Sequence, residues 1–424
     1  MNKKRVVITG IGAVSPLGHN IVETFDNLCA GRNAIFELPE FKEAGFPVYI
    51  GARVQNIEKL YEKYPEAERY GSRKLAYALS AMDEALMMAG ISDLSKEECG
   101  LYFGVETSRI AFKSAFEIFK RSAGDDMLVD YRLFGEKCLD MLQKDDIINK
   151  FPFFIPKYIA SKFNISGPLL STSNACASSN FAIGEAYRKL SEGRVEIAVT
   201  GSADEMIDEY IVTGFSILGA LSESNDSPET ASRPFDRNRN GFVIGEAGAV
   251  LIMETLEHAV ARNAEIICEV AGFGTSSDGE KITACHPEGS GLAKAMKRAI
   301  SDAGLTPDDM VYINAHATST RLNDASETRA IKSVFGGHAK KLLINSTKSM
   351  IGHTVAAAGA IEAAVTARSI LEGRCHPTRN LTEPDAVCDL FYCPDGFVEA
   401  DIKAAMSNSC GFSGGNSCVV FKKY

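Results

Sequence analysis

The stretch that decides the fold is GPLLSTSNACASSNFAIGEAYRKL, residues 167–190. Two leucines begin a short apolar run that ends in serine, threonine and asparagine, and Cys176 and several small residues then lead into an amphipathic segment. This order predicts a strand, a turn and a helix, with Cys176 at or near the helix N-terminus. Free N–H groups and the helix dipole at such a position favour a thiolate. Because cysteines are more often buried and inert, this segment alone leaves both interpretations open.

Similar apolar runs rich in β-branched residues recur on both sides of this segment. Helical patterns separate them, most clearly at residues 72–90 and 291–304. Alternation of this kind predicts an α/β fold with largely parallel, buried strands. The predicted strands are RVVITG (5–10), CGLYFGV (99–105), EIAVTGSA (196–203), GAVLIME (248–254), MVYINAH (310–316), KLLINS (341–346) and SCVVFKK (417–423).

The two halves of the chain have a similar cadence of strands and helices, with a break near residues 250–265. We therefore expect a duplicated fold with an N-terminal half over residues 1–255 and a C-terminal half over 256–424. The region near 107–165 departs from the cadence, because it is rich in aromatic and charged residues. It is interpreted as a helical insertion that caps a pocket or forms a subunit interface.

Composition excludes several classes of protein. The 424 residues are 45% hydrophobic and 24% charged, which is typical of a globular chain with a large core. The formal net charge is −10 and no block of Lys and Arg stands out, so binding to bulk nucleic acid is disfavoured. No apolar run is long enough for a membrane span, and the first residues resemble a β-strand rather than a signal peptide. We expect a cytoplasmic protein whose 11 scattered cysteines are mostly buried and reduced.

Three further segments favour a chemical role for Cys176. His316 follows a predicted strand, Lys348 and His353 surround another strand-to-helix turn, and Cys410 lies beside a glycine-rich loop between two terminal strands. Binding sites of α/β sheets collect at the carboxyl ends of strands. One cysteine and two histidines at such junctions therefore predict an active site.

At these residues the chain resembles the elongating β-ketoacyl-[acyl-carrier-protein] synthases of the thiolase superfamily. The resemblance runs the whole length and keeps the order of the motifs. The motifs are TGIGAVSPLG (9–18), NACASS (174–179), SRPFDRNRNGFVIGEAGAV (232–250), HATSTRLND (316–324), TKSMIGH (347–353) and NSCGFSGGN (408–416). The resemblance implies a thiolase-like duplicated five-layered α/β/α/β/α fold and usually a dimer.

The resemblance also implies roles for individual residues. Cys176 matches the nucleophile that takes the acyl chain, and His316 and His353 match the pair that holds the malonyl thioester during loss of CO₂. Lys348 matches a lysine that supports the histidines electrostatically, and Glu327 matches an acidic residue paired with it. A structural ion pair is the alternative for these last two residues.

Binding groups follow from the same resemblance. The backbone N–H groups of Cys176 and Cys410 match an oxyanion hole, and Thr318 and Thr320 match threonines of the phosphopantetheine tunnel. Arg73 and Lys74 are the basic candidates for docking of the acidic acyl carrier protein. The resemblance implies no metal and no bound cofactor, because phosphopantetheine is carried by the acyl carrier protein.

Departures from the family's motifs indicate which biosynthetic pathway the protein serves. Ala317 and Arg321 replace a usual glycine and proline, and Cys410 stands where the fatty-acid enzymes are expected to have an aromatic gate over the nucleophile. These features and EPDAVCDLFYCP (383–394) resemble the ketosynthase subunits of type II polyketide systems. Such subunits form heterodimers with an inactive chain-length factor. Polyketide or polyene biosynthesis is therefore favoured over primary fatty-acid elongation.

Other members of the superfamily remain as alternatives. A non-catalytic chain-length factor typically has glutamine in place of Cys176, and an initiating synthase uses asparagine in place of the second histidine. A thiolase would use a second catalytic cysteine, for which Cys410 is the candidate. These alternatives are minor, because the motif around Lys348 and His353 fits the condensing branch better.

Overall fold

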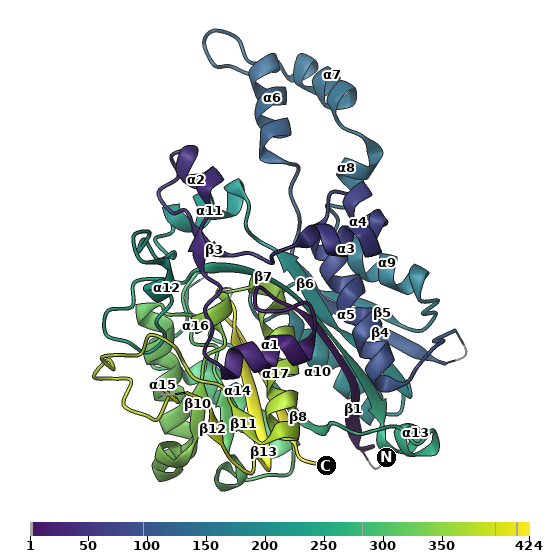
Figure 1. Cartoon of the computed structure of the whole chain (residues 1–424), viewed down its shortest axis with the longest axis vertical. Coiled ribbons are helices and arrows are strands. Elements are labelled where there is room, and N and C mark those ends of the chain that lie inside the picture. The colour runs from purple at the N-terminus through teal and green to yellow at the C-terminus, as the bar shows by residue number, and fades with distance from the viewer. Residues whose placement is uncertain (1–2, 96, 282, 395, 413) are drawn as a thin grey trace.

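The computed structural model describes residues 3–95, 97–281, 283–394, 396–412 and 414–424. A continuous mixed β-sheet runs through the body, with helices on both of its faces (Figure 1). Its main strands, in spatial order, are β5 (Leu169–Thr172), β4 (Cys99–Gly104), β6 (Ile197–Glu205), β7 (Ile244–Thr255), β1 (Val6–Val14), β8 (Cys268–Ser277), β14 (Gly415–Lys422), β13 (Ala404–Cys410), β9 (Tyr312–Asn314) and β10 (Leu343–Asn345).

Strand topology shows that the fold is duplicated. The main strands form two sets of five, and each set has the spatial order third, second, fourth, fifth, first; the sets are β1, β4, β5, β6 and β7, and β8, β9, β10, β13 and β14. In both sets the third strand is parallel to the second and the second to the fourth, whereas the fifth is antiparallel to the fourth and the first. A short antiparallel pairing of β1 with β8 joins the two sets. The predicted thiolase-like α/β fold is confirmed, and β7 ends at Thr255.

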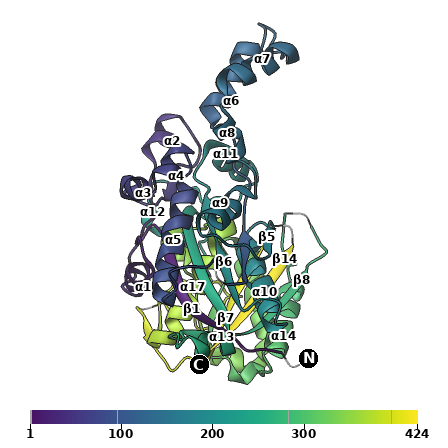
Figure 2. The same cartoon turned by 90° about the vertical axis from the view of Figure 1, so that its right-hand side faces the viewer.

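Helices complete the layers (Figure 2). On the outside of the first set, α5 (Arg73–Ala89) packs on β1 and β7, and on the outside of the second set α14 (Ser290–Asp302) packs on β8 and β14. α15 (Arg321–Phe335) lies against α14. Between the two sets, α10 (Ser178–Ser191) packs against α17 (Ala358–Glu372). Strands covered on both faces in this way are buried along their whole length, as β1 and β7 are.

The contact between α10 and α17 is unusually close at the first turns of both helices. The Ala360 N–H donates to the Ser179 hydroxyl oxygen at 2.9 Å. A Cβ atom on Gly359 would lie 2.9 Å from the backbone nitrogen of Asn180, so only glycine permits this approach. The N-terminal ends of the two central helices are therefore held together.

The insertion forms an arm that projects from the body (Figures 1 and 2). It contains α6 (Phe112–Ser122), α7 (Tyr131–Met141) and α8 (Lys144–Ile148), and the chain returns to the body through α9 (Phe154–Lys162). No residue of α7 is buried. The prediction of a helical insertion is confirmed in its secondary structure.

None of the helices in the described ranges is both long and apolar enough to cross a membrane.

Shorter elements connect and flank this framework. The remaining elements are α1 (Ile21–Cys29), β2 (Phe36–Glu37), α2 (Pro39–Glu43), β3 (Ile50–Ala52), α3 (Ile57–Lys63), α4 (Pro65–Arg69), α11 (Glu209–Ile217), α12 (Pro228–Ala231), α13 (Leu256–Ala261), η1 (Pro307–Asp309), η2 (Gly336–Lys341), α16 (Lys348–Ile351), η3 (Val355–Ala357), β11 (Arg374–Cys375) and β12 (Val398–Glu399).

Candidate active site

Cys176 occupies the turn between β5 and α10, as the local sequence predicts. It lies two residues before the first helical residue, Ser178. Ala175, immediately before it, has a φ of 48°, a left-handed conformation that costs a residue with a Cβ atom roughly 1–3 kcal/mol. The strained turn holds the cysteine side chain, 4% exposed, toward the space between the two sets of strands.

The two histidines come from turns that follow strands of the second half, as Cys176 follows a strand of the first. His316 lies two residues after the end of β9, and His353 follows β10 and the short helix α16. Ala317 and Val355 have φ angles of 26° and 45°, so a strained residue lies within two positions of each histidine, as Ala175 lies next to the cysteine. Such strain persists only where the surroundings enforce it, and it clusters at functional sites.

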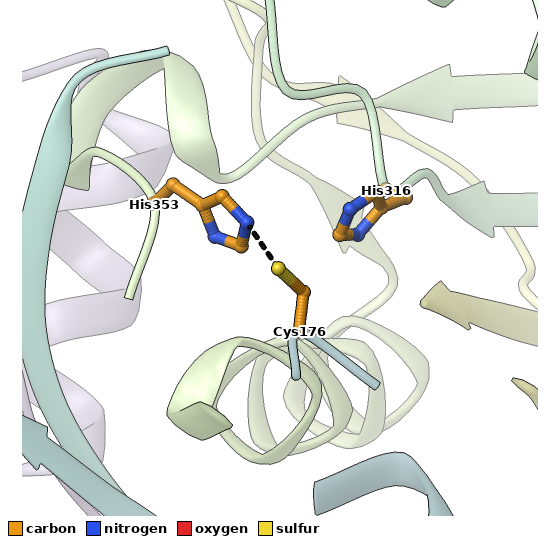
Figure 3. A group of neighbouring side chains, drawn as sticks. All are labelled: Cys176, His316 and His353. Atoms are coloured by element: carbon orange, nitrogen blue, oxygen red, sulfur yellow. Dashed lines mark hydrogen bonds between the residues drawn. The ribbon is translucent and has the colours of Figure 1, made fainter. Parts of the chain in front are cut away.

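These three side chains meet in one buried group (Figure 3). His353 Nε2 lies 3.0 Å from Cys176 Sγ. The rings of His316 and His353 are 5.4 Å apart between centroids and nearly perpendicular, with an interplanar angle of 83°. The predicted constellation of one cysteine and two histidines therefore exists in space.

A backbone contact fixes which nitrogen of His353 carries the proton. The Val355 N–H donates to His353 Nδ1 at 3.3 Å, so Nδ1 is the acceptor and the proton of the neutral ring lies on Nε2. That N–H points toward Cys176 Sγ, where it can donate to a thiolate or to an oxygen of a substrate.

The same tautomer bears on metal binding. Cys176, His316 and His353 offer one sulfur and two nitrogens within 4.8 Å of one another, a donor set that suits zinc. A protonated Nε2 cannot coordinate a metal ion. If the proton moved to Nδ1, that N–H would point at the Val355 N–H, and the hydrogen bond between them would be lost. The donor set therefore does not fit a metal ion in this tautomer, and a site without metal stays a prediction.

Lys348 lies behind the histidines and forms an ion pair with Glu362 of α17, with both side chains buried. The expected pairing of Lys348 with Glu327 is wrong. The Glu327 carboxylate instead accepts from the His316 and Ala317 N–H groups, at 3.0 and 2.8 Å, and from the Asn408 amide. Glu327 therefore shapes the strained turn that carries His316. Sequence analysis missed Glu362, although a single carboxylate in the Ala/Gly-rich run 355–364 was a signal for it.

Burial and the neighbouring lysine keep both imidazoles neutral. Burial lowers the pKa of His316 well below its usual value, and Lys348 and His353 lower it further. Burial and Lys348 act on the pKa of His353 in the same direction. Both rings are therefore neutral at pH 7, with one N–H each available as a hydrogen-bond donor.

The thiol of Cys176 is affected most strongly by burial. Burial raises its pKa to about 12, and the charge of Lys348 and the backbone N–H groups of Cys176 and Phe412 oppose this rise. Desolvation therefore opposes the thiolate that the helix terminus favours, and it outweighs the effect of the N–H groups.

The second N–H group of the candidate oxyanion hole also needs correction. It belongs to Phe412 and not to Cys410. Cys410 is the last residue of β13 and still pairs with Asn416 of β14, whereas Phe412 lies in the loop beyond the strand. The aromatic residue near the nucleophile is Phe412 as well, and its ring contacts that of Phe242, which packs on His353.

A cavity of about 200 Å³ connects these groups. Thr318 and Thr320 line it, as predicted, and their hydroxyl oxygens lie 3.0 Å apart. Leu218 and Leu322, both exposed, lie at its outer end. The cavity has the polar and apolar lining expected for a thioester arm.

Arg73 and Lys74 are not a docking surface. Arg73 donates to the Glu246 carboxylate at 2.8 Å, and Lys74, 5% exposed, donates to the Glu106 carbonyl oxygen at 3.0 Å. Both side chains point into the protein at the start of α5, so the sequence-based assignment to carrier docking is wrong. A buried lysine is rare, and sequence alone gives no sign of it.

Replacing Glu362 with leucine should destabilise the protein strongly, because the Lys348 ammonium would remain buried without its counter-charge. We expect the free energy of unfolding to fall by about 3–5 kcal/mol, measured by urea denaturation. Asp401→Asn is the matched control, since it removes an exposed partner of Lys423 and should leave the urea midpoint unchanged. Equal midpoints for Glu362→Leu and the parent would contradict a buried, charge-compensated pair.

Alkylation of Cys176 by iodoacetamide should accelerate with pH without a plateau. Because the pKa is raised to about 12, the thiolate fraction should increase roughly tenfold for each pH unit between about pH 7 and 10. Peptide-level mass spectrometry follows the reaction at Cys176 alone, with Cys176→Ala as the background. A rate that levels off below about pH 8 would show that the thiolate is stabilised and the pKa lowered.

Comparisons with known proteins agree with this geometry. The chain matches the N-terminal domain of beta-ketoacyl synthases over residues 3–259 and the C-terminal domain over residues 267–382. A 3-oxoacyl-[acyl-carrier-protein] synthase 2 from Staphylococcus aureus (strain N315) is 38% identical over 433 residues, 99% of each chain. A protein of the same name from Coxiella burnetii is 36% identical over 437 residues, 100% of this chain and 99% of its own.

Solved structures give the same result. A beta-ketoacyl synthase from Burkholderia phymatum STM815 superposes with a TM-score of 0.88 at 32% identity, over 99% of this chain and all of its own. A chain of a type II PKS acyl-carrier protein in complex with its ketosynthase bound to the hexaketide superposes with a TM-score of 0.87 at 31% identity, over the whole of both chains. The ishigamide ketosynthase/chain length factor superposes with a TM-score of 0.85 at 28% identity, also over the whole of both chains. With the buried Cys-His-His group and a match over nearly its full length, this chain belongs to the beta-ketoacyl synthase family.

Proposed function

We propose that this protein is a 3-oxoacyl-[acyl-carrier-protein] synthase that joins an acyl chain on Cys176 to a malonyl unit by decarboxylative Claisen condensation. The observation that carries the proposal is the buried group of Cys176, His316 and His353 in one cavity. The cavity accommodates a phosphopantetheine arm, which the acyl carrier protein supplies.

In the first half-reaction Cys176 takes the acyl chain from the carrier thioester. The thiol attacks the thioester carbonyl, and the new carbon–sulfur bond forms as the bond to the pantetheine sulfur breaks. The thiol proton leaves with the pantetheine thiol, so the products are the acyl-enzyme and the free carrier thiol. The N–H groups of Cys176 and Phe412 face this position and stabilise the oxyanion of the intermediate.

In the second half-reaction the histidines act on the malonyl thioester. Its carbonyl oxygen accepts N–H bonds from His316 and His353, and the carbon–carbon bond to the carboxylate breaks with release of CO₂. The electron pair left behind forms an enolate, which attacks the acyl carbonyl and expels the Cys176 thiolate. Neutral imidazoles suit this step, because preformed N–H donors stabilise charge only as it develops.

For the pathway we propose type II polyketide or polyene biosynthesis, with fatty-acid elongation as the second candidate. A ketosynthase fold that pairs with a polyketide carrier protein superposes over the whole chain, which supports the first. The curated relatives named 3-oxoacyl-[acyl-carrier-protein] synthase 2 at 36–38% identity support the second.

We also propose that a second subunit of the same fold covers the arm and the edge of the sheet. Tyr131 and Leu139 of α7 are each 86% exposed, and β5, at the end of the strand order, presents exposed leucines at 169 and 170. Apolar side chains on an unpacked arm and an open strand edge mark an interaction surface. The partner is a second copy of this chain or a chain-length-factor-like subunit, as in the ishigamide ketosynthase/chain length factor.

Cys176→Gln should abolish condensation while release of CO₂ from malonyl-carrier protein continues at or above the parent rate. The amide mimics an acylated cysteine, and the histidines that support decarboxylation remain. Adding His316→Ala in the same background should slow CO₂ release by about 10²–10³, since it removes one donor to the developing enolate. Radiometric CO₂ release and product mass spectrometry measure the two activities. Undiminished CO₂ release in the double variant would refute the role of His316.

Tyr131→Asp combined with Leu139→Asp should separate the subunits without unfolding the body, because both residues lie on the arm. Sedimentation velocity should show a dimer, or a complex with the chain-length-factor-like subunit, for the parent and a single chain for the variant. Met87→Asp is the control, as Met87 is 77% exposed on α5 and lies outside the arm. A complex that survives both arm substitutions contradicts the proposed interface.

A further inference from the structure

A second cavity, of about 280 Å³, lies at the base of the arm beside the start of α5. Its wall is unusually charged for a site near an apolar core. The residues that matter here are Lys74, Asp204, Glu205, Met206 and Ile207. Arginine and lysine side chains of the arm base lie at its outer part.

An apolar cluster links this cavity to Cys176. Met206 and Ile207 line the cavity and also pack in the apolar cluster that contains Cys176 and Val355. The next residue after Val355, Ala356, donates its N–H to the Asp204 carboxylate at 3.1 Å. Met206 therefore lines the charged cavity and belongs to the same apolar cluster as Cys176, and an unbranched thioether of this kind repacks readily.

Lys74 is the unusual member of the wall. It is 5% exposed, and its ammonium group donates to the Glu106 carbonyl oxygen at 3.0 Å. Among the described residues it forms no ion pair, in contrast to Lys348, which has Glu362. An ammonium group has three N–H donors, so a buried lysine with one close acceptor retains donors for a ligand.

Asp204 adds a second polar group to the same wall. It is buried, and burial raises its pKa to about 7 while Lys74 opposes the rise. Burial thus favours the protonated form more than water does, and the two carboxyl oxygens accept the Ala356 and Glu205 N–H groups. A saturated alkyl chain entering this space would desolvate both groups without replacing their hydrogen bonds, which is unfavourable.

We propose that the acyl chains preferred by this enzyme carry carbonyl or hydroxyl oxygens along the chain, and that Lys74 selects them by hydrogen bonding. The inference rests on the proposed condensing function and names its substrate class. Lys74 is a specificity-determining residue in this scheme, whereas Cys176, His316 and His353 perform the chemistry. A growing poly-β-keto chain has the required acceptors, and a fatty acyl chain lacks them.

The test compares acylation of Cys176 by two series of acyl-pantetheine thioesters of equal length. One series is saturated and the other carries a single ketone at successive positions; intact-protein mass spectrometry gives the rates. The parent should prefer the best ketone over its saturated counterpart by roughly ten- to a hundredfold, the effect of one hydrogen bond to a charged group. Lys74→Met should bring the ratio close to one, and Lys74→Arg should retain it. Lys157→Met, an exposed lysine on α9, is the matched control and should keep the parent ratio.

Each outcome decides between the alternatives. Equal rates for the ketone and saturated thioesters in the parent overturn the inference, as does a preference that Lys74→Met leaves intact. If Lys74→Met does not fold, the parent ratio and that of Lys74→Gln provide the same decision. Failure of every thioester to acylate a parent Cys176 that still reacts with iodoacetamide would instead contradict the proposed condensing function.

Discussion

The active site depends on the contact that holds the first turns of α10 and α17 together. One hydrogen bond, from the Ala360 N–H to the Ser179 hydroxyl, and the close approach at Gly359 fix the two helix ends. Cys176 lies three residues before Ser179, and His353 precedes the turn that begins α17. Because these helices belong to different halves of the duplicated fold, the contact sets the distance between Cys176 of one half and His353 of the other.

Burial has opposite consequences for the groups that meet there. It keeps both histidines neutral, so that each retains one N–H donor, and it keeps the free Cys176 as a thiol. The charge on Lys348 is paired with that of Glu362, which offsets the cost of burying it. The site is therefore prepared for charge that appears during reaction rather than for charge present beforehand, which is the arrangement that assists an enolate.

Sequence analysis predicts the elements of this site better than their pairings. Cys176, His316 and His353 are predictable because each follows a strand of a recognisable apolar run, and carboxyl ends of parallel strands converge. The partner of Lys348 is not predictable in this way, since Glu327 and Glu362 both lie on helices near the site and only packing decides between them. The assignment to Cys410 instead of Phe412 comes from matching the motif NSCGFSGGN, and two residues so close in the chain are told apart only when their backbone N–H groups are placed in space. The strand β8 escapes the apolar-run criterion, because its later residues are glycine, serine and threonine.

Lys74 shows most clearly what sequence analysis does not predict. Its hydropathy predicts a position on the surface, whereas in the structure it is buried. The two buried lysines differ in their compensation: Lys348 has the Glu362 carboxylate close by, whereas Lys74 donates to a backbone carbonyl and has Asp204 and Glu205 at longer range. Burying an ammonium without a full partner costs several kcal/mol in stability. A ligand that supplies further acceptors offsets part of this cost, which is the basis of the proposed selectivity. Burial is common to both lysines; what distinguishes Lys74, and underlies the proposed selectivity for the acyl chain, is that its close acceptor is a backbone carbonyl and not a carboxylate.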